Sequence, residues 1–326
     1  MASIDRPKIL VFGVGGVGTI YLYLLSRVSS PTAVCRSNYE VVRNDGFIIN
    51  SSIYGNGIRL KPNVVRDCAE ATFRDSRPFD YILICSKAIG QDIPDLISPA
   101  VTPDHTVIVL IQNGIGIEAH YQATFPNNPI VSAVVYLPVT QRPAGVITHG
   151  ELERLEIGSY PSSASSEHSE AFTQLIRHAG GTAEHHDDIQ LKRWTKLLVN
   201  ASWNPICALT LCTDANFLLS SPSSSELVSD VMLEICDIAK AHGYTIPKEI
   251  LELQLGRATA RIGNGNGVEP SMLQDVRAGR RMEVEAIVGN AVRMGREKDV
   301  KCEKLNMLYL LARALDSQIE NKRRTS

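Results

Sequence analysis

Three glycines stand between an apolar run and a helical pattern near the N-terminus. The run "KILVFG" at 8–13 has the length and β-branched content of a buried strand, and "GTIYLYLLSRV" at 18–28 has a helical pattern. Gly13, Gly15 and Gly18 form G-x-G-x-x-G, which after a strand and before a helix is typical of dinucleotide binding. The first glycine permits a tight turn, the second lets the backbone approach a pyrophosphate, and the third allows close packing of helix and sheet. The helix N-terminus would then offer N–H groups to the phosphates.

Apolar runs and helical stretches alternate over roughly the first third of the chain. The further strand-like runs are "TAVCR" at 32–36, "FDYILICSK" at 79–87 and "HTVIVLIQNG" at 105–114. Nearly continuous apolar strands that are separated by helices indicate a parallel sheet covered on both faces. We therefore expect an α/β domain of the Rossmann type.

The pattern changes twice further along the chain. Short, turn-bounded runs between 130 and 160 ("IVSAVVYLP", "GVITHGE", "RLEIGS") indicate strands in an antiparallel arrangement. Beyond them the pattern is helical almost to the end, with breaks that include the loop "GNGNGVEP" at 263–270. A chain of 326 residues is long for one hydrophobic core. We predict an α/β domain over 1–187 and an all-helical domain over 188–326.

The residues after the second strand indicate which dinucleotide binds. An NAD site usually has Asp or Glu there, which accepts hydrogen bonds from the ribose hydroxyls. Here the strand ends in "CRSN", which has Arg36 and no acid. A guanidinium pairs with a phosphate and gains nothing from a neutral hydroxyl, so Arg36 favours NADPH. The alternative, an exposed arginine at a strand end, leaves the missing carboxylate unexplained.

Two more strands end in polar residues. Lys87 ends the run at 79–87, and Asn113 lies at the end of the run at 105–114. Ligands in such sheets bind outside the carboxyl ends of the strands. Lys87 could therefore reach a phosphate or the ribose, and Asn113 could reach the ribose or nicotinamide side. The alternative for each is a loop residue that caps the next helix.

The segment "RWTKLLVNASWNP" at 193–205 places three polar side chains along an apolar helix. Lys196, Asn200 and Asn204 are spaced four residues apart, so they form a stripe that steps only about 40° per turn. Because burial of an unpaired ammonium is costly, one alternative is that Lys196 extends to solvent beside a solvated groove. The other is that the stripe lines a cleft opposite the cofactor. Partial desolvation would then lower the lysine pKa and make Lys196 a candidate proton donor, with the asparagines holding substrate.

Local signals also predict helix boundaries. Pro205 predicts a kink or an end of the helix at Asn204. The segment at 269–295 predicts a second long helix, in which Ser271 and Gln274 form a capping box. Glu283 would lie roughly 18 Å along that helix from Ser271, so the two could not contact one small group. One could still face substrate and the other cofactor.

Composition argues against several classes of protein. A net charge of −2 and a pI near 6.5 argue against nucleic-acid binding. The seven cysteines include no C-x-x-C pair, which argues against a disulfide framework or a zinc ribbon and fits a reducing compartment. The N-terminus has no signal-peptide pattern and its apolar run is too short for a membrane span, so we expect a cytoplasmic protein. "EHHDD" at 184–188 could suggest a metal, but adjacent histidines point apart, so we expect a polar turn between domains and no metal.

These blocks occur in the order and spacing of one enzyme family. Through "GVGGVG", the arginine after the second strand, "SK", "QNG", "WTKLLVNASWNP" and "SMLQDVRAGRRMEVE", nearly the whole chain resembles ketopantoate reductases (2-dehydropantoate 2-reductases). The resemblance implies a Rossmann-type domain followed by a helical domain of the 6-phosphogluconate-dehydrogenase-like kind. It further implies hydride transfer from NADPH to a 2-oxo carbon, with Lys196 as the general acid that protonates the developing alkoxide. By position it assigns substrate binding to Asn200, Asn204 and Ser271, and cofactor binding to Gly13, Val14, Gly15, Gly16, Val17, Gly18, Arg36, Lys87, Asn113 and Glu283.

Two residues depart from the family pattern. Asp214 and Val268 stand where the family commonly has asparagines. An added carboxylate and a lost amide near the carboxylate end of the substrate would argue for a substrate other than ketopantoate. Three functions thus stay open: a ketopantoate reductase of pantothenate biosynthesis, a diverged reductase of another oxo compound, as in secondary metabolism, and a non-catalytic NADPH-binding sensor. Lys196 with both asparagines argues against the sensor. A small oxo acid is the expected partner, without nucleic acid or membrane, and a homodimer stays open.

Overall fold

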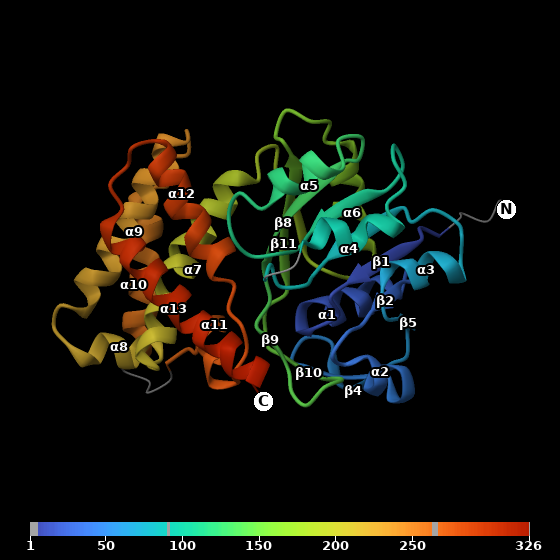
Figure 1. The fold of residues 1–326 in the computed structure, drawn as a ribbon, viewed down its shortest axis with the longest axis horizontal. Helices are drawn as coiled ribbons and strands as arrows, with labels where there is room; N and C mark the ends of the chain where they lie inside the picture. The colour runs from blue at the N-terminus through green and yellow to red at the C-terminus, as the bar shows by residue number, and fades with distance from the viewer. Residues whose placement is uncertain (1–5, 90–91, 263–266, 326) are drawn as a thin grey trace. The chain divides into compact units, whose positions relative to one another are not determined.

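A computed structural model describes residues 6–89, 92–262 and 267–325, and the chain forms two compact units (Figure 1). The first unit comprises Met1–Gln112 and Glu118–Ile189, and the second comprises Asn113–Ile117 and Gln190–Ser326. Four residues of the predicted loop at 263–270, namely 263–266, lie outside the described residues. The predicted order, an α/β part followed by a helical part, is confirmed.

The first unit contains an eight-stranded sheet. Its strand order is β12 (Ala183–His185), β11 (Arg154–Tyr160), β8 (Ile130–Tyr136), β7 (Val107–Leu110), β6 (Tyr81–Ile84), β1 (Ile9–Phe12), β2 (Thr32–Val34) and β5 (Asn63–Val65). The strands from β8 to β5 are parallel, and the central ones are buried runs of apolar residues, as expected for a sheet covered on both faces. The predicted antiparallel pairing is found between β8 and β11.

Part of the segment that follows β2 forms a second sheet with residues far along the chain. This sheet has the order β4 (Gly55–Leu60), β3 (Phe47–Ser51), β10 (Val146–His149) and β9 (Val139–Gln141). β10 is antiparallel to β9, as predicted for this region, but it pairs in parallel with β3. The local sequence pattern does not predict this sheet, because its strands are short and its pairing joins residues about 100 positions apart.

The helices of the first unit are α1 (Gly16–Leu25), α2 (Tyr39–Asp45), α3 (Cys68–Arg74), α4 (Ile93–Ile97), α5 (Glu118–Thr124) and α6 (Glu167–His178), with a 3-10 turn η1 (Ser98–Ala100). Helix α1 buries nearly all of its side chains, since it is apolar on every face. It therefore forms part of the core beside the sheet.

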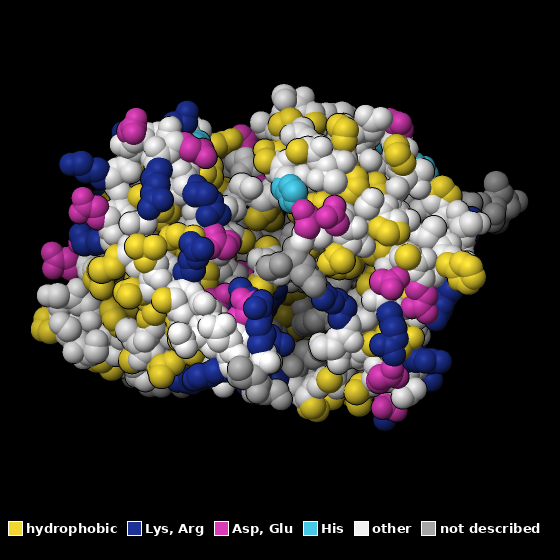
Figure 2. Space-filling model, in the orientation of Figure 1, with side chains coloured by type: hydrophobic (Ala, Val, Ile, Leu, Met, Phe, Trp, Pro, Cys, Tyr) yellow, Lys and Arg dark blue, Asp and Glu magenta, His cyan; other side chains and the backbone are white. Residues whose placement is uncertain are grey.

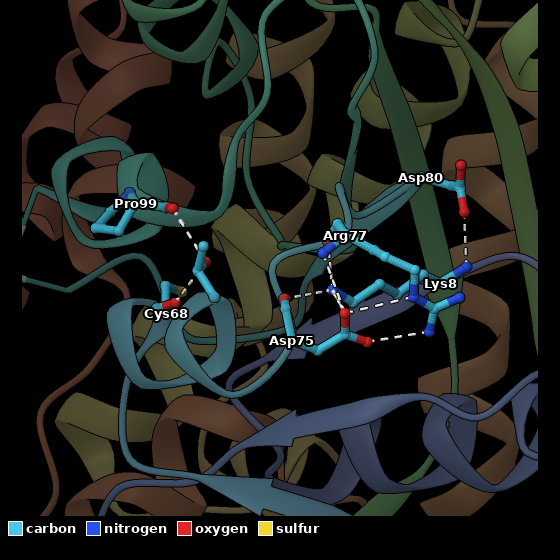
Figure 3. A network of polar contacts seen from close by, with 7 residues as sticks. Lys8, Cys68, Asp75, Arg77, Asp80 and Pro99 are labelled. Atoms are coloured by element: carbon cyan, nitrogen blue, oxygen red, sulfur yellow. Dashed lines mark hydrogen bonds and ion pairs between the residues drawn. The ribbon is translucent and has the colours of Figure 1, made fainter.

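Polar contacts fix the starts of two central strands (Figure 3). The backbone N–H of Lys8, immediately before β1, donates to Oδ2 of Asp80, immediately before β6, at 2.7 Å. The Lys8 ammonium donates to the carbonyl oxygen of Asp75 at 2.8 Å, and Arg77 donates to the carboxylate of Asp75 at 3.0 Å. Burial lowers the pKa of Lys8, and the Asp75 carboxylate opposes this shift. These contacts hold the register in which Ile9 faces Tyr81.

The second unit is helical. Its helices are α7 (Gln190–Thr210), α8 (Asp214–Ser220), α9 (Ser224–Ala241), α10 (Lys248–Ile262), α11 (Ser271–Arg277), α12 (Asn290–Glu297) and α13 (Glu303–Thr325), with a π-helical segment η2 (Glu285–Gly289). Helices α9, α10, α11 and α13 all pack against α7 (Figure 1). The buried face of α7, including Trp194, Leu198 and Ala201, forms the centre of this core.

The observed helix boundaries differ from the predicted ones at two places. Of the predicted kink or end of the helix at Asn204, the end is wrong: α7 continues through Pro205 to Thr210, because the residues on both sides of the proline are buried in the core and their packing outweighs one lost hydrogen bond. The segment at 269–295 is not one helix, since α11 ends at Arg277 and Gly279 adopts φ +61°. Distances along a single helix axis therefore do not relate Ser271 to Glu283.

The capping-box prediction is also wrong. Pro270, rather than Ser271, is the N-cap of α11, and Ser271 is its first helical residue. The backbone N–H of Gln274 donates to the carbonyl oxygen of Pro270 at 3.1 Å, and the Gln274 amide donates to the carbonyl oxygen of Glu269 at 2.9 Å. The Ser271 hydroxyl is thus available for a contact elsewhere.

The surface has mixed charge. Lys and Arg side chains are interspersed with Asp and Glu side chains on the face shown in Figure 2. Among the described residues, none of the helices combines the length and the apolar character that crossing a membrane requires.

Candidate active site

The glycine loop follows β1 and lies close to other backbone at two of its three glycines. Gly13 adopts φ +87°, and a Cβ there would lie 2.4 Å from the backbone nitrogen of Ser86. A Cβ at Gly18 would lie 2.6 Å from the carbonyl oxygen of Gly13. A Cβ at Gly15, the N-cap of α1, would meet nothing within 4 Å. Two glycines therefore permit close packing, and the third faces open space at a helix N-terminus.

The intervening residues of the loop are held by the first unit. The Val14 carbonyl oxygen accepts a hydrogen bond from the amide of Asn38 at 2.8 Å. A Cβ at Gly16 would lie 3.0 Å from a methyl group of Val139 in β9, and Val17 packs against the core. Asn38 was not among the predicted site residues, although it lies in "CRSN" at the end of the second strand.

Polar residues follow the ends of the neighbouring strands. Phe12 of β1 is in register with Val34 of β2 and with Ile84 of β6, so the residues after these three strands lie along one edge of the sheet. Arg36 follows β2, Lys87 follows β6, and both are exposed. The Ser86 hydroxyl oxygen is buried and has no hydrogen-bond partner among the described residues. Ser86 was not among the predicted site residues, and its only signal in the sequence is its place beside Lys87 in "SK".

The second unit holds the segment Asn113–Ile117, which follows "VIVLIQ". The guanidinium of Arg193 donates to the carbonyl oxygen of Gly114 at 3.0 Å. The backbone N–H of Ile115 donates to the carbonyl oxygen of Ala286 at 3.1 Å. Gly114 adopts φ +108°, and a Cβ there would lie 2.3 Å from the same Ala286 oxygen. Only glycine at position 114 lets the segment approach η2 this closely.

We expect Gly114→Ala to lower the free energy of unfolding by about 2 kcal/mol or more, because the new methyl group combines a strained φ with a backbone clash. Urea unfolding followed by tryptophan fluorescence measures this effect. Both tryptophans, Trp194 and Trp203, lie in α7, so the signal reports on the second unit.

Gly256→Ala is the matched control for this variant. Gly256 lies on the exposed face of α10, and a Cβ there meets nothing within 4 Å. We expect this variant to be more stable than the wild type by about 0.5–1 kcal/mol. Equal stability of Gly114→Ala and wild type would contradict the tight docking of the segment.

Lys196 lies in α7 opposite the Asn113 side chain. Its ammonium donates to Oδ1 of Asn113 at 2.7 Å. Burial and, to a smaller extent, the Arg193 guanidinium lower the pKa of Lys196 to about 7, although the carboxylate of Glu283 opposes both. Glu283 is itself buried, with 5% of its surface exposed. A lysine whose pKa lies near 7 can carry a proton at neutral pH and release it to a reacting oxygen.

The other polar residues of the stripe differ in their contacts. Oδ1 of Asn204 accepts hydrogen bonds from the Ser271 hydroxyl at 3.0 Å and from the backbone N–H of Met272 at 3.1 Å. Because a backbone N–H can only donate, the amide oxygen of Asn204 must face Met272 and Ser271. The NH₂ group of Asn204 therefore points away from these two residues. Among the described residues, no hydrogen bond of that NH₂ group or of the half-buried Asn200 side chain is found. Both side chains can therefore serve a ligand.

The "EHHDD" segment ends β12 in an ion network. His185 and His186 face different partners, a serine of α6 and Glu156 of β11 respectively. Ligand atoms of Glu156, Glu184 and His186 lie within 4.8 Å of one another. Arg154 pairs with both carboxylates, and His186 also contacts Glu156, so both acidic groups already have partners. We assign this cluster no ligand.

Comparisons with known proteins match both units of this chain to one enzyme family. The family model described as "Ketopantoate reductase PanE/ApbA" matches residues 9–162, and "Ketopantoate reductase PanE/ApbA C terminal" matches residues 188–316. A 2-dehydropantoate 2-reductase of Nostoc sp. is 28% identical over 96% of this chain and 97% of its own length. The crystal structure of 2-dehydropantoate 2-reductase from Methylococcus capsulatus is 34% identical with a TM-score of 0.83 and covers 96% of this chain and 97% of its own. A ternary structure of D-mandelate dehydrogenase with NADH and anilino(oxo)acetate, 17% identical, has the same fold over 96% of this chain and 99% of its own, with a TM-score of 0.83.

Proposed function

This chain belongs to the ketopantoate reductase family of NAD(P)-dependent oxidoreductases, and we propose that it reduces 2-dehydropantoate to pantoate with NADPH. The observation that carries the proposal is Lys196, a half-buried lysine with a pKa near 7 beside Asn113 and Glu283. A protein that only senses a dinucleotide has no use for such a proton donor. The relatives named 2-dehydropantoate 2-reductases support the substrate.

The first unit fits a bound NADPH. The open space in front of Gly15 and the buried, unpartnered hydroxyl of Ser86 both lie at the edge where the pyrophosphate would bind. We assign the pyrophosphate to the loop from Gly13 to Gly18, the 2′-phosphate to Arg36, and a phosphate or ribose oxygen to Lys87. The bound cofactor would supply the hydride.

The second unit would hold the substrate and move the proton. We assign the substrate to Asn200, Asn204 and Ser271, whose amide and hydroxyl groups bind an oxo acid without adding charge. Lys196 would donate its proton to the oxygen of the former carbonyl group as negative charge develops there. Asn113 would orient the Lys196 ammonium, and Glu283 would bind the nicotinamide ribose while favouring protonation of Lys196.

Arg36→Ala tests the choice of cofactor. We expect the KM for NADPH to rise about 10- to 100-fold, because a charge-assisted contact with the 2′-phosphate is lost. The KM for NADH should change by less than about twofold, since NADH lacks that phosphate. Steady-state kinetics with both cofactors measures the two constants. Arg43→Ala, in α2, is the matched control, because it removes an exposed arginine that does not follow a strand of the main sheet. An unchanged KM for NADPH in Arg36→Ala would remove Arg36 from the cofactor site.

A second candidate is a reductase of another oxo compound. The sequence alone favours it through Asp214 and Val268, which stand where the family commonly has asparagines. A panel of ketopantoate, other 2-oxo acids and neutral ketones, each with NADPH and NADH, separates the candidates. We expect the highest kcat/KM for ketopantoate with NADPH. A higher value for another compound would replace the substrate and leave the roles of Lys196 and Arg36 in place.

A further inference from the structure

Asp214, the first residue of α8, is buried, and both oxygens of its carboxylate have hydrogen-bond or ion-pair partners. Its Oδ1 accepts hydrogen bonds from the backbone N–H of Val268 at 2.7 Å and of Ala215 at 2.8 Å. Its Oδ2 forms an ion pair with the guanidinium of Arg261 from α10. Only 3% of the Asp214 surface is exposed. A carboxylate with three donors and a paired charge is not available to repel or bind a substrate anion.

The contacts of Asp214 fix the chain just before α11. The Asp214 N–H donates to the carbonyl oxygen of Val268 at 3.2 Å, so the two residues are joined in both directions. Gly267 packs on α8, since a Cβ there would lie 2.1 Å from the hydroxyl oxygen of Thr213. Three residues after Val268, the Ser271 hydroxyl donates to Asn204. The short span from Val268 to Ser271 is therefore held at one end by Asp214 and at the other by Asn204.

We propose that Asp214 and Arg261 form a positioning pair, which fixes the span from Val268 to Ser271 and thereby sets the affinity for the oxo acid without contacting it. The two departures from the family pattern then have one explanation. Val268 contributes its backbone N–H and carbonyl rather than a side-chain amide, and Asp214 receives that N–H. The part of this proposal that concerns the oxo acid rests on the proposed function.

Three variants test the pair through kinetics with ketopantoate and NADPH. Asp214→Ala removes every side-chain contact, and we expect the KM for the oxo acid to rise about 30-fold. Asp214→Asn keeps an acceptor for Val268 but breaks the ion pair, and Arg261→Gln breaks it from the other side. We expect about a fivefold rise in KM for each, with kcat changed by less than about threefold and NADPH affinity unchanged. Asp214→Asn with Arg261→Gln should be no worse than either alone, because both remove the same contact.

The alternative hypothesis, that the Asp214 carboxylate contacts the substrate directly, predicts the opposite change in KM. If the Asp214 carboxylate faced the substrate, Asp214→Asn would relieve repulsion and lower the KM for an anionic oxo acid. That result would overturn the positioning pair. The matched control is Arg257→Gln, one turn before Arg261 in α10, whose guanidinium contacts Gln254. We expect its kinetics to equal those of the wild type.

Hydrogen exchange provides a readout that does not depend on turnover. In NMR measurements, we expect the Val268 amide to exchange faster in Asp214→Ala than in wild type, and to exchange at the wild-type rate in Arg257→Gln. If the wild type reduces no oxo acid yet Asp214→Ala speeds the exchange of this amide, the proposed function fails and the positioning of the span stands. Wild-type exchange together with a wild-type KM in Asp214→Ala and Asp214→Asn would overturn the pair. Tryptophan fluorescence during unfolding identifies any variant that does not fold.

Discussion

Replacing Lys196 with alanine should lower kcat/KM for reduction of the oxo acid by about 10³-fold, with the NADPH dissociation constant changed by less than about twofold. The Lys196 ammonium is the only proton donor that we assign to the reacting oxygen. The alanine variant removes the positive charge that would stabilise the developing alkoxide. The loss should fall on kcat. Stopped-flow measurement of NADPH oxidation and fluorescence titration of NADPH separate the two quantities.

The control for this variant is Thr195→Ala, the adjacent position on α7, where the hydroxyl donates only to the backbone of Leu191 among the contacts described. We expect nearly wild-type kinetics for it. If Lys196→Ala turned over ketopantoate at the wild-type rate, another group would have to supply the proton. If Lys196→Ala weakened NADPH binding and left kcat unchanged, Lys196 would belong to the cofactor site instead.

The pH dependence follows from the same residue. Reduction requires protonated Lys196, and burial lowers its pKa to about 7. The rate of reduction should therefore be highest below about pH 6 and fall about tenfold per pH unit well above pH 7, while oxidation of the hydroxy acid, which needs the neutral amine, should rise with pH. Arg193→Gln removes a positive charge that lowers the pKa of Lys196, so the fall in reduction should move to higher pH. Glu283→Gln removes the opposing carboxylate and should move it to lower pH.

Two substitutions of Asn204 should separate its structural contacts from substrate binding. Asn204→Ala removes the acceptor for Ser271 and Met272, and we expect a loss of stability of about 1–3 kcal/mol with a KM for the oxo acid raised about 100-fold. Asn204→Asp keeps that acceptor and should retain most of the stability. It loses the NH₂ donor and adds a negative charge, so its KM for an anionic substrate should rise at least about 100-fold. Urea unfolding and steady-state kinetics measure the two effects.

Ser202→Ala is the control on the same helix, since the Ser202 hydroxyl donates only to backbone carbonyls of α7. We expect it to change the KM by less than about twofold. A normal KM in Asn204→Asp would show that the NH₂ group of Asn204 does not bind the substrate. Asn204 would then act only by holding α11.

The local patterns of the sequence predicted most of the first unit and the components of the site. The apolar runs became β1, β2, β6, β7 and β8, because a strand buried on both faces must be apolar throughout. The glycine loop has the positive φ and close contacts at Gly13 that its spacing indicates. The stripe of Lys196, Asn200 and Asn204 lies on one continuous helix, as its period requires. The uses of these residues stay predictions that the variants above will test.

Local patterns failed where distant packing decides the outcome. The helix does not end at Asn204, because the core around α7 tolerates Pro205. The run at 269–295 is not one helix, because Gly279 breaks a pattern that is otherwise helical. Asn38 and Ser86 carry no motif of their own. Their relation to the glycine loop exists only because strands from three parts of the chain are neighbours in one sheet.

The sequence by itself determined the order of the two units, the glycine loop and the polar stripe on α7. Each of these follows from periodic or contiguous patterns that extend over about twenty residues or fewer. The tertiary structure alone decided which partners these residues have. It places Asn113 against Lys196, partly buries that lysine near Arg193 and Glu283, and joins Asp214 to Val268 and Arg261. A pKa and a paired charge depend on neighbours from distant parts of the chain, and only the packed fold brings those neighbours together.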